Sequence, residues 1–309
     1  MKYLFGGGGA RAVPYGLILP GLLLYLVFAL GPSLATIVYS LTDTNGLTPA
    51  PLHFIGLDNY REFLFVGAAA MQNIGALVRT LVFCVLVTTV QFAVGLLAAV
   101  LLNQRLRGTR WFRALFFLPV ILGVTIQGLM WRLFLYPLGG PVDSLLGIVG
   151  AESELLGGGA TEAFIWVTVV QIWSNMGITM VIFLAGLQTI PDELHEAAKI
   201  DGASRRQGFW HVTWPLLTPA TTTNLILMII GSLQAWQLFL VLINYRVGTQ
   251  VLGYVVYAQA FGQTSGSTTS NSFRQGYGAA ASVVLFVLVF VIGITAQYLL
   301  RKREERLLG

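Results

Sequence analysis

Among the amide side chains within long apolar runs of this 309-residue sequence, six are candidates for lining a solute pathway. They are Gln91, Gln127, Gln171, Asn175, Gln234 and Gln237, and Trp173 and Trp236 lie among them. An amide offers hydrogen-bond donors and acceptors, and an aromatic face suits the C–H surface of a sugar. The combination indicates non-covalent binding of a neutral, polyhydroxylated solute.

The spacing of two amide pairs is helical. Gln171 and Asn175 are four residues apart, and Gln234 and Gln237 are three apart, so each pair is expected on one face of a helix. Polar side chains inside membrane spans face the bundle interior or a water-filled cavity. The same amides would equally serve as hydrogen bonds between helices. The residues alone leave both interpretations open.

Groups for catalysis, metal binding or proton transfer are missing from the apolar runs. All 13 acidic residues lie in loops or tails, the three histidines lack ligand spacing, and Cys84 is the one cysteine. Buried carboxylates are the usual relays of ion-coupled transporters, so their absence argues against coupling to an ion gradient. No nucleotide-binding motif occurs. We expect no enzyme activity, no metal site and no cofactor bound by this chain.

The elements that must position the amides are membrane-spanning helices. The chain is 56% hydrophobic and only 10% charged, whereas soluble domains are about a quarter charged. Runs long enough to cross a ~30 Å hydrocarbon core predict an all-α, polytopic membrane protein with six spans. The predicted spans are 16–39, 77–102, 114–136, 163–187, 220–244 and 277–300. A cytoplasmic segment 1–15 and a cytoplasmic tail 301–309 then flank a transmembrane domain, 16–300.

The distribution of Lys and Arg predicts the orientation. With both termini in the cytoplasm, 13 of the 18 basic residues fall inside, as the positive-inside rule favours. The net charge of +5 therefore reflects topology, and no nucleic-acid partner is expected. A long charged stretch, residues 193–215, then faces the cytoplasm.

This polar insert has the start and stop signals of two short helices. Thr189 is the expected N-cap, Pro191 fits the first turn, and Gly202 fits a break or C-cap. Ser204 and Gln207 fit a capping box that starts the second helix. Two roles suit such a segment: an amphipathic anchor at the membrane surface, or a docking element for a cytoplasmic partner.

The insert resembles the EAA loop of bacterial ABC importer permeases. That pattern is Glu-Ala-Ala, three residues, Gly, nine residues, then Ile-x-Leu-Pro. The residues that match in register are Glu196, Ala197, Ala198, Gly202 and Pro215. Val212 stands where the pattern has isoleucine, and Trp214 stands where it has leucine, a change expected to alter the packing of the loop but not its reach.

Other segments resemble the maltose-type sugar permeases, and in particular the first, or "A", subunit of such systems. They are Pro14-Tyr15 with Leu19-Pro20, residues 54–60 (FIGLDNY), Arg107-Gly108 with residues 117–119 (FLP), residues 131–134 (WRLF), and residues 185–188 (AGLQ) with Ile190-Pro191. Together, in order and spacing, they extend the resemblance over nearly the whole chain.

The resemblance implies the type I ABC importer permease fold in a bacterial cell membrane. It implies a second permease in a heterodimer, two ABC ATPase subunits that bind the ATP and Mg²⁺, and an extracytoplasmic solute-binding protein. Embedded in lipid, this chain would form half of the pathway for a sugar or sugar-like solute.

The resemblance also implies roles for single residues. The insert would be the helix that couples to the ATPase, within a coupling loop 189–219 and with Glu196 as its anchor. The surface fitted to the ATPase would comprise Ala197, Ala198, Asp201, Gly202 and Ala203. Sugar-contacting positions of the maltose permease align with Gln171 and Asn175, and near residues 234–237.

Three other functions are set against this interpretation. A permease for glycerol phosphate or another charged solute belongs to the same family, and a cationic lining would favour it. An ion-coupled secondary transporter would need buried carboxylates and usually an internal repeat, and the sequence shows neither. A membrane enzyme would need clustered reactive groups at membrane depth, which the sequence lacks.

Overall fold

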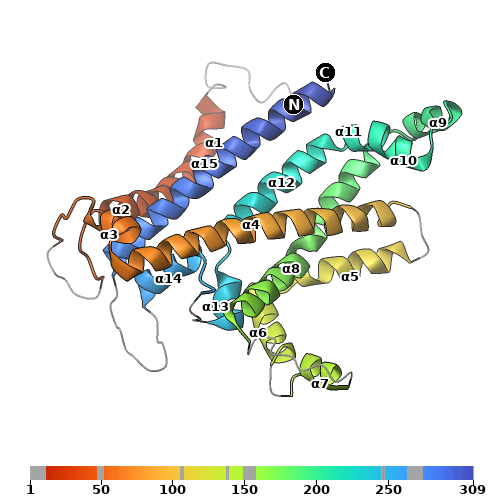
Figure 1. The fold of residues 1–309 in the computed structure, drawn as a ribbon. Helices are drawn as coiled ribbons and strands as arrows, with labels where there is room; N and C mark the ends of the chain where they lie inside the picture. Colours follow the sequence, from red (N-terminus) through yellow and green to blue (C-terminus); the bar gives the residue numbers. More distant parts are fainter. Residues whose placement is uncertain are drawn as a thin grey trace. The chain divides into compact units, whose positions relative to one another are not determined.

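The computed structural model describes residues 12–46, 52–104, 108–136, 139–148, 158–244, 246, 248–262 and 274–308. Predictions for the segment 1–11, and for Arg105 and Arg107, lie outside this part of the chain. Apart from one isolated bridge between Thr42 and Phe54, the described residues form helices and connecting loops (Figure 1). The all-α prediction is confirmed for the part of the chain that is described.

The helices belong to two compact units. Unit 1 comprises Met1–Gly67 and Val256–Val284, and unit 2 comprises Ala68–Val255 and Leu285–Gly309. Unit 1 contains α1 (Ala12–Tyr25), the π-helical η1 (Leu26–Leu30), α2 (Gly31–Tyr39), α3 (Asp58–Phe65), the end of α14 (Leu252–Phe261) and the start of α15 (Gln275–Leu308).

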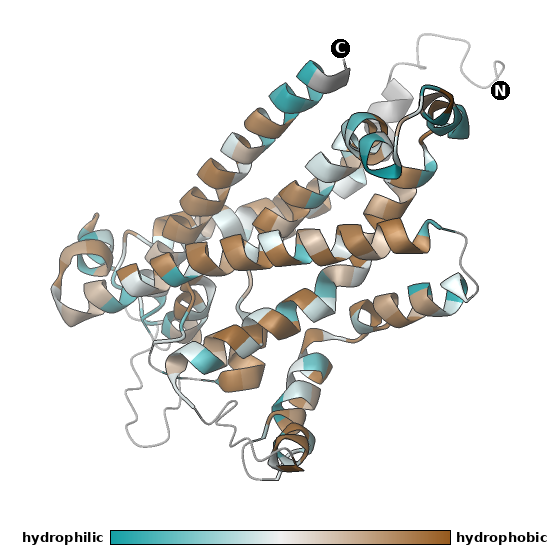
Figure 2. Cartoon of the chain, turned by 45° about the vertical axis from the view of Figure 1, so that its right-hand side comes forward, coloured by the Kyte–Doolittle hydropathy of each residue, from teal (hydrophilic) through white to brown (hydrophobic). Residues whose placement is uncertain are grey.

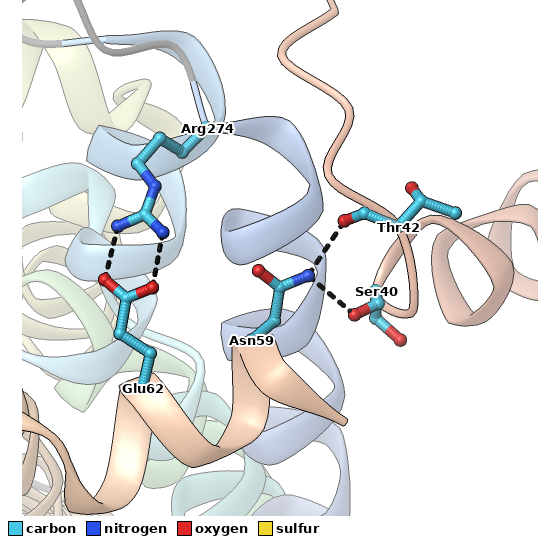
Figure 3. Close-up of polar contacts among 5 residues, drawn as sticks. All are labelled: Ser40, Thr42, Asn59, Glu62 and Arg274. Atoms are coloured by element: carbon cyan, nitrogen blue, oxygen red, sulfur yellow. Dashed lines mark hydrogen bonds and ion pairs between the residues drawn. The ribbon is translucent and has the colours of Figure 1, made fainter. Parts of the chain in front are cut away.

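Polar contacts in unit 1 join α3 to the segment after α2 and to the start of α15. Asn59 Nδ2 donates to the main-chain oxygens of Ser40 and Thr42, both at 2.9 Å. Glu62 accepts two hydrogen bonds from Arg274, at 2.7 and 2.6 Å (Figure 3). The bonds from Arg274 lower the pKa of the Glu62 carboxyl, and the same contact raises the pKa of Arg274. Three segments far apart in sequence are thereby held together.

Unit 2 holds the longest apolar helices and the polar insert. Its elements are α4 (Gly67–Leu102), α5 (Thr109–Ile121), α6 (Val124–Phe134), α7 (Pro141–Ile148), α8 (Ala160–Gln188), α9 (Asp192–Ile200), α10 (Arg205–Gly208), the π-helical η2 (Phe209–Thr213), α11 (Trp214–Leu216), α12 (Thr218–Leu233), α13 (Gln237–Ile243), the start of α14 and the rest of α15. In Figure 2 the long helices are mostly hydrophobic, whereas the short helices of the insert carry many hydrophilic residues.

An apolar core packs α4 against α8 beneath the insert. Ala99, Phe183 and Leu217 are fully buried in it, so the core also includes the residue that precedes α12. Close approach elsewhere on α8 depends on Gly177, because a Cβ there would meet the main-chain oxygen of Phe116 on α5. Small residues allow such backbone contact between membrane helices. The insert therefore rests on a closely packed base.

The number of spans agrees with the prediction only if each of two bent helix pairs is counted as one span. Four described helices are long and apolar enough to cross a membrane, and up to six do so if each bent pair forms one span. The predicted third span is not straight: α5 and α6 meet at 101°. Helix α15 continues through most of the predicted tail 301–309, as far as Leu308.

The bend between α5 and α6 has an identifiable cause. Gln127 Nε2 donates to the main-chain oxygens of Pro119, at 2.6 Å, and Leu122, at 2.9 Å. A helix break leaves carbonyl groups without their usual partners, and a buried carbonyl needs a donor. Gln127 supplies that donor from the first turn of α6. This amide therefore stabilises the break.

The predicted fifth span, 220–244, is also interrupted. Helix α12 ends at Leu233, and α13 begins at Gln237. Gln234 caps the C-terminus of α12, whereas Gln237 is the first residue of α13. The expectation that these two amides share one helical face was wrong, because the backbone leaves the helix between them.

Candidate functional site

A partly open cavity of about 180 Å³ lies among α4, α8 and α12 of unit 2. Its polar lining comes from six residues on these three helices: Gln91, Gln171, Asn175, Thr179, Asn224 and Ser232. Apolar side chains such as Val87 and Met228 complete the wall, and none of its described lining residues is charged. The cavity therefore presents amides and hydroxyls within an apolar surround.

Hydrogen bonds hold together the back of this cavity, the part formed by the buried residues Gln91, Thr179 and Asn224. Gln91 is only 4% exposed, and its Nε2 donates to Thr179 Oγ1 at 2.8 Å. Asn224 Nδ2 donates to the main-chain oxygen of Thr179 at 3.3 Å. One turn of α8 thus receives a donor from α4 and another from α12. These bonds hold the three helices in register around the cavity.

The front of the cavity, its more exposed part, carries the pair predicted from helical spacing. Gln171 and Asn175 both line it and both are partly exposed. Asn175 Nδ2 donates to the main-chain oxygen of Gln171 at 3.0 Å. The structure brings these two residues together with Gln91, as their polarity within apolar runs suggested.

The other predicted pathway residues do not line this cavity. Trp173 packs edge-on against Trp131, with ring centroids 5.5 Å apart. Trp236 packs close to Gly253 of α14, where an added Cβ would lie 3.1 Å from the Trp236 Cβ. Gln234 and Gln237 are exposed at the break between α12 and α13. The structure therefore separates the predicted amides of the fifth span from those of the fourth.

Asn224, Thr179 and Ser232 line the cavity but were not among the predicted residues. Asn224 was visible in the sequence as an amide inside an apolar run, which is the same signal that identified the other six. Thr179 and Ser232 carry hydroxyls that bond within helices as often as they line cavities, so their types alone did not distinguish them.

The polar insert forms two short helices joined by a tight turn, as predicted. Helix α9 ends in a Schellman motif: the amide of Ala203 donates to the oxygen of Ala198, and that of Gly202 to Lys199. Gly202 has φ +78°, a left-handed conformation that a side chain disfavours. Ser204 and Gln207 form the predicted capping box at the start of α10. The turn therefore requires Gly202, the glycine of the EAA pattern.

The predicted start of the first insert helix was wrong. Thr189 caps the C-terminus of α8, and its hydroxyl donates to the oxygen of Gly186 at 2.8 Å. Pro191 is the N-cap of α9, not a residue of its first turn. The error arose because Thr189 found an acceptor in the preceding helix, which the sequence pattern does not reveal.

The residues predicted to meet an ATPase lie together on the surface of the insert. Glu196, Ala197, Asp201 and Gly202 are exposed, and Ala198 and Ala203 are partly exposed. Ile200, on the same helix as Glu196, is 85% exposed. A carboxylate, small residues and a projecting apolar side chain therefore lie on one short, exposed segment.

Trp214, which departs from the EAA pattern, connects this insert to the rest of unit 2. Its ring lies 5.6 Å from that of Trp210 and 6.3 Å from that of Phe92 on α4. The guanidinium of Arg303 on α15 lies 5.7 Å from the same ring. Phe92 follows Gln91 in the sequence, so the insert packs directly against the helix that forms the back of the cavity.

Comparisons with known proteins identify relatives over nearly the whole chain. The permease protein MsmF of the multiple sugar-binding transport system of Streptococcus mutans is 34% identical over 93% of this chain and 94% of its own. AraP of the arabinooligosaccharides transport system of Halalkalibacterium halodurans is 32% identical over 94% and 88%. MalF of the trehalose/maltose transport system of Thermococcus litoralis is 30% identical over 94% of each.

A solved structure supports the fold. A chain of a bacterial alginate ABC transporter, crystallised in complex with an alginate pentasaccharide-bound periplasmic protein, superposes with a TM-score of 0.80. It covers 96% of both chains at 21% identity. The family described as "Binding-protein-dependent transport system inner membrane component" matches residues 91–305. On this match and the relatives above, the chain belongs to the family of binding-protein-dependent transport system inner membrane components.

Proposed function

We propose that this permease forms one side of the translocation pathway of an ATP-driven importer for a neutral sugar or sugar-like solute. The observation that carries the proposal is the cavity lined by amides and hydroxyls from α4, α8 and α12, with no charged residue in its described lining. Hydroxyl groups of a sugar both donate and accept hydrogen bonds, as amides do. The names of MsmF, AraP and MalF, which refer to sugars, support the same solute class.

The size of the cavity supports a pathway shared between two permeases. Sites that enclose a drug-sized ligand usually measure ~300–1,000 Å³. A cavity of about 180 Å³ that is partly open is smaller than that range. A second permease facing the cavity would complete the enclosure, and an extracytoplasmic binding protein would deliver the solute. Both termini and the insert then lie in the cytoplasm.

Energy for transport would enter through the insert. Glu196 and the small residues beside it would seat in an ATPase subunit, which alone would bind ATP and Mg²⁺. Movement of α9 would pass through Trp214 to Phe92 and so to α4. The packing of these rings supports this route, because rigid contact transmits displacement between elements.

The cavity is tested by solute uptake in the complete transporter reconstituted with its partner subunits. We expect Gln171→Leu and Asn175→Leu to raise the KM for a neutral oligosaccharide while leaving assembly unchanged, because each removes a hydrogen-bonding group from the wall. Gln234→Leu is the matched comparison, since this exposed amide lies outside the cavity. Unchanged KM values in the first two variants would refute the cavity as the solute pathway.

The coupling role is tested by solute-stimulated ATP hydrolysis in the same preparation. Glu196→Ala is expected to abolish stimulation, and Gly202→Pro is expected to do the same by distorting the turn. Glu193→Ala serves as the control, because Glu193 is an acidic residue of the same helix outside the EAA pattern. If both test variants transport normally, the insert acts only as a surface helix.

A further inference from the structure

A second and larger cavity lies at the end of unit 2 that carries the insert. Its volume is about 660 Å³, it is partly open, and it shares no residue with the amide cavity. Its polar lining includes Asn103, Thr109, Arg113, Gln188 and Asp192. These residues follow α4, begin α5, end α8 and begin α9, so four helix ends meet around one space.

Arg113 gives this cavity its chemical character. Its Nε is buried and has no hydrogen-bond partner among the residues that the structure describes. A guanidinium carries five donors in a planar fork that matches the oxygens of a phosphate group. Arg113 lines the cavity, so its guanidinium would stabilise an anion bound there through charge-assisted hydrogen bonds.

The cavity lies where apolar helices give way to polar segments. The apolar helix α4 ends at Leu102, which borders the cavity. Trp111, two residues before Arg113, is 81% exposed, and Phe112 is 52% exposed. Aromatic side chains with such exposure are typical of the level of lipid headgroups. Phospholipids present their phosphate groups at this level.

Asp192 adds a charge of the opposite sign to the same lining. It stands in the first turn of α9 and has an exposed side chain. A headgroup with only negative charge would be repelled by this carboxylate. A headgroup that carries a phosphate and an ammonium group satisfies Arg113 with the first and Asp192 with the second.

We propose that this cavity binds the headgroup of a zwitterionic aminophospholipid, with the phosphate at Arg113 and the ammonium at Asp192. The binding site is separate from the solute pathway and does not depend on the transported solute. Because Asp192 begins the helix that carries Glu196, bound lipid would stabilise the start of the insert.

The test is native mass spectrometry of the complete transporter. The complex is exchanged into mixtures of phosphatidylethanolamine, phosphatidylglycerol and a diglucosyl glycolipid that has no phosphate. We expect phosphatidylethanolamine to be retained best. Arg113→Gln is expected to lower retention of both phospholipids by about tenfold, equivalent to about 1.4 kcal/mol. Asp192→Asn is expected to abolish the preference for phosphatidylethanolamine over phosphatidylglycerol.

Matched controls separate this site from general lipid attraction. Arg110→Gln removes a basic residue from the same helix, but Arg110 is exposed and does not line the cavity, so lipid retention should not change. Arg113→Lys keeps the charge without the planar fork and should give intermediate retention, which covers the case in which Arg113→Gln fails to fold.

Three results would overturn the proposal. The first is wild-type retention in both Arg113 variants and in Asp192→Asn. The second is an equal loss in Arg110→Gln, which would indicate non-specific attraction to the lipid surface. The third is displacement of phosphatidylethanolamine by millimolar inorganic phosphate, which would make the cavity a site for free phosphate. None of these readouts uses transport, so they stand apart from the test of the proposed function.

Discussion

Single side chains in this protein act through partners far away in the sequence. Gln91 is an example, because its amide reaches Thr179 on another helix and both groups are buried. Its type and position within an apolar run predicted a polar role, but not the partner. The partner depends on how α4 packs on α8, which is a tertiary property.

Replacing Gln91 by Leu should destabilise unit 2 by about 1–3 kcal/mol, because the Thr179 hydroxyl loses its donor while remaining buried. The thermal unfolding midpoint in detergent measures the change. The double variant Gln91→Leu/Thr179→Val removes both polar groups and should recover most of the loss. A double variant less stable than the sum of the two single variants would contradict this account.

A second prediction at the scale of single residues concerns Gly177. Gly177→Ala would place a methyl group against the main chain of α5, and overpacking of this kind costs about 1–3 kcal/mol. Gly21→Ala provides the comparison, because no described atom beyond its own helical turn lies within 4 Å of a Cβ at that position. We expect the thermal unfolding midpoint of Gly177→Ala to lie below those of wild type and Gly21→Ala.

At the scale of elements, straight apolar helices were predictable and breaks were not. The predicted span 163–187 corresponds closely to α8, since a long apolar run between polar ends determines both limits. Helix α4 begins ten residues before the predicted 77, because Gly67–Ala76 favours a helix although it is less apolar. The bend between α5 and α6 is stabilised by the contacts of Gln127, which hydropathy does not contain.

The turn of the insert can be tested as an element. Gly202→Ala forces a side chain into a left-handed conformation, at a cost of about 1–2 kcal/mol. We expect faster hydrogen exchange at the amides of residues 201–203 and weaker solute-stimulated ATP hydrolysis. Gly208→Ala should change neither, because Gly208 has φ −57° and open space around it. Equal exchange in both variants would show that the Schellman turn is not limiting.

At the scale of the whole molecule, contacts across long sequence distances define each unit. The pairing of Glu62 with Arg274 joins residues 212 positions apart within unit 1. Neither the pairing nor the division into two units followed from the sequence, because hydropathy locates spans without assigning neighbours. The family, in contrast, was identifiable from the EAA loop alone, because Gly202 and Pro215 are held at fixed spacing by the turn and by the helix that follows.

The Glu62–Arg274 pair predicts a pH dependence. The pKa of Glu62 is lowered in the folded state, so its contribution is fully present above the unfolded value of about 4.3 and is lost as the pH falls through the folded pKa. Both side chains are more than a third exposed, at 37% and 40%, so the contribution is below about 1 kcal/mol. Hydrogen exchange in α3 is the measurement.

We expect Glu62→Gln to exchange faster than wild type at pH 7 and equally fast well below pH 4. A double-mutant cycle with Arg274→Gln supplies the control, since the second substitution should have little further effect once the first is made. A difference between wild type and Glu62→Gln that persists at low pH would exclude the ion pair as its source.

The exposed apolar surface of α9 has a consequence for how the cell makes this protein. Ile200 presents most of its side chain to water at the tip of the insert. Any copy synthesised in excess of its partners displays this side chain on a protruding turn, which is the kind of feature that chaperones and proteases of the cell recognise. We therefore expect a copy made in excess of its partner subunits to be degraded faster than one within an assembled transporter.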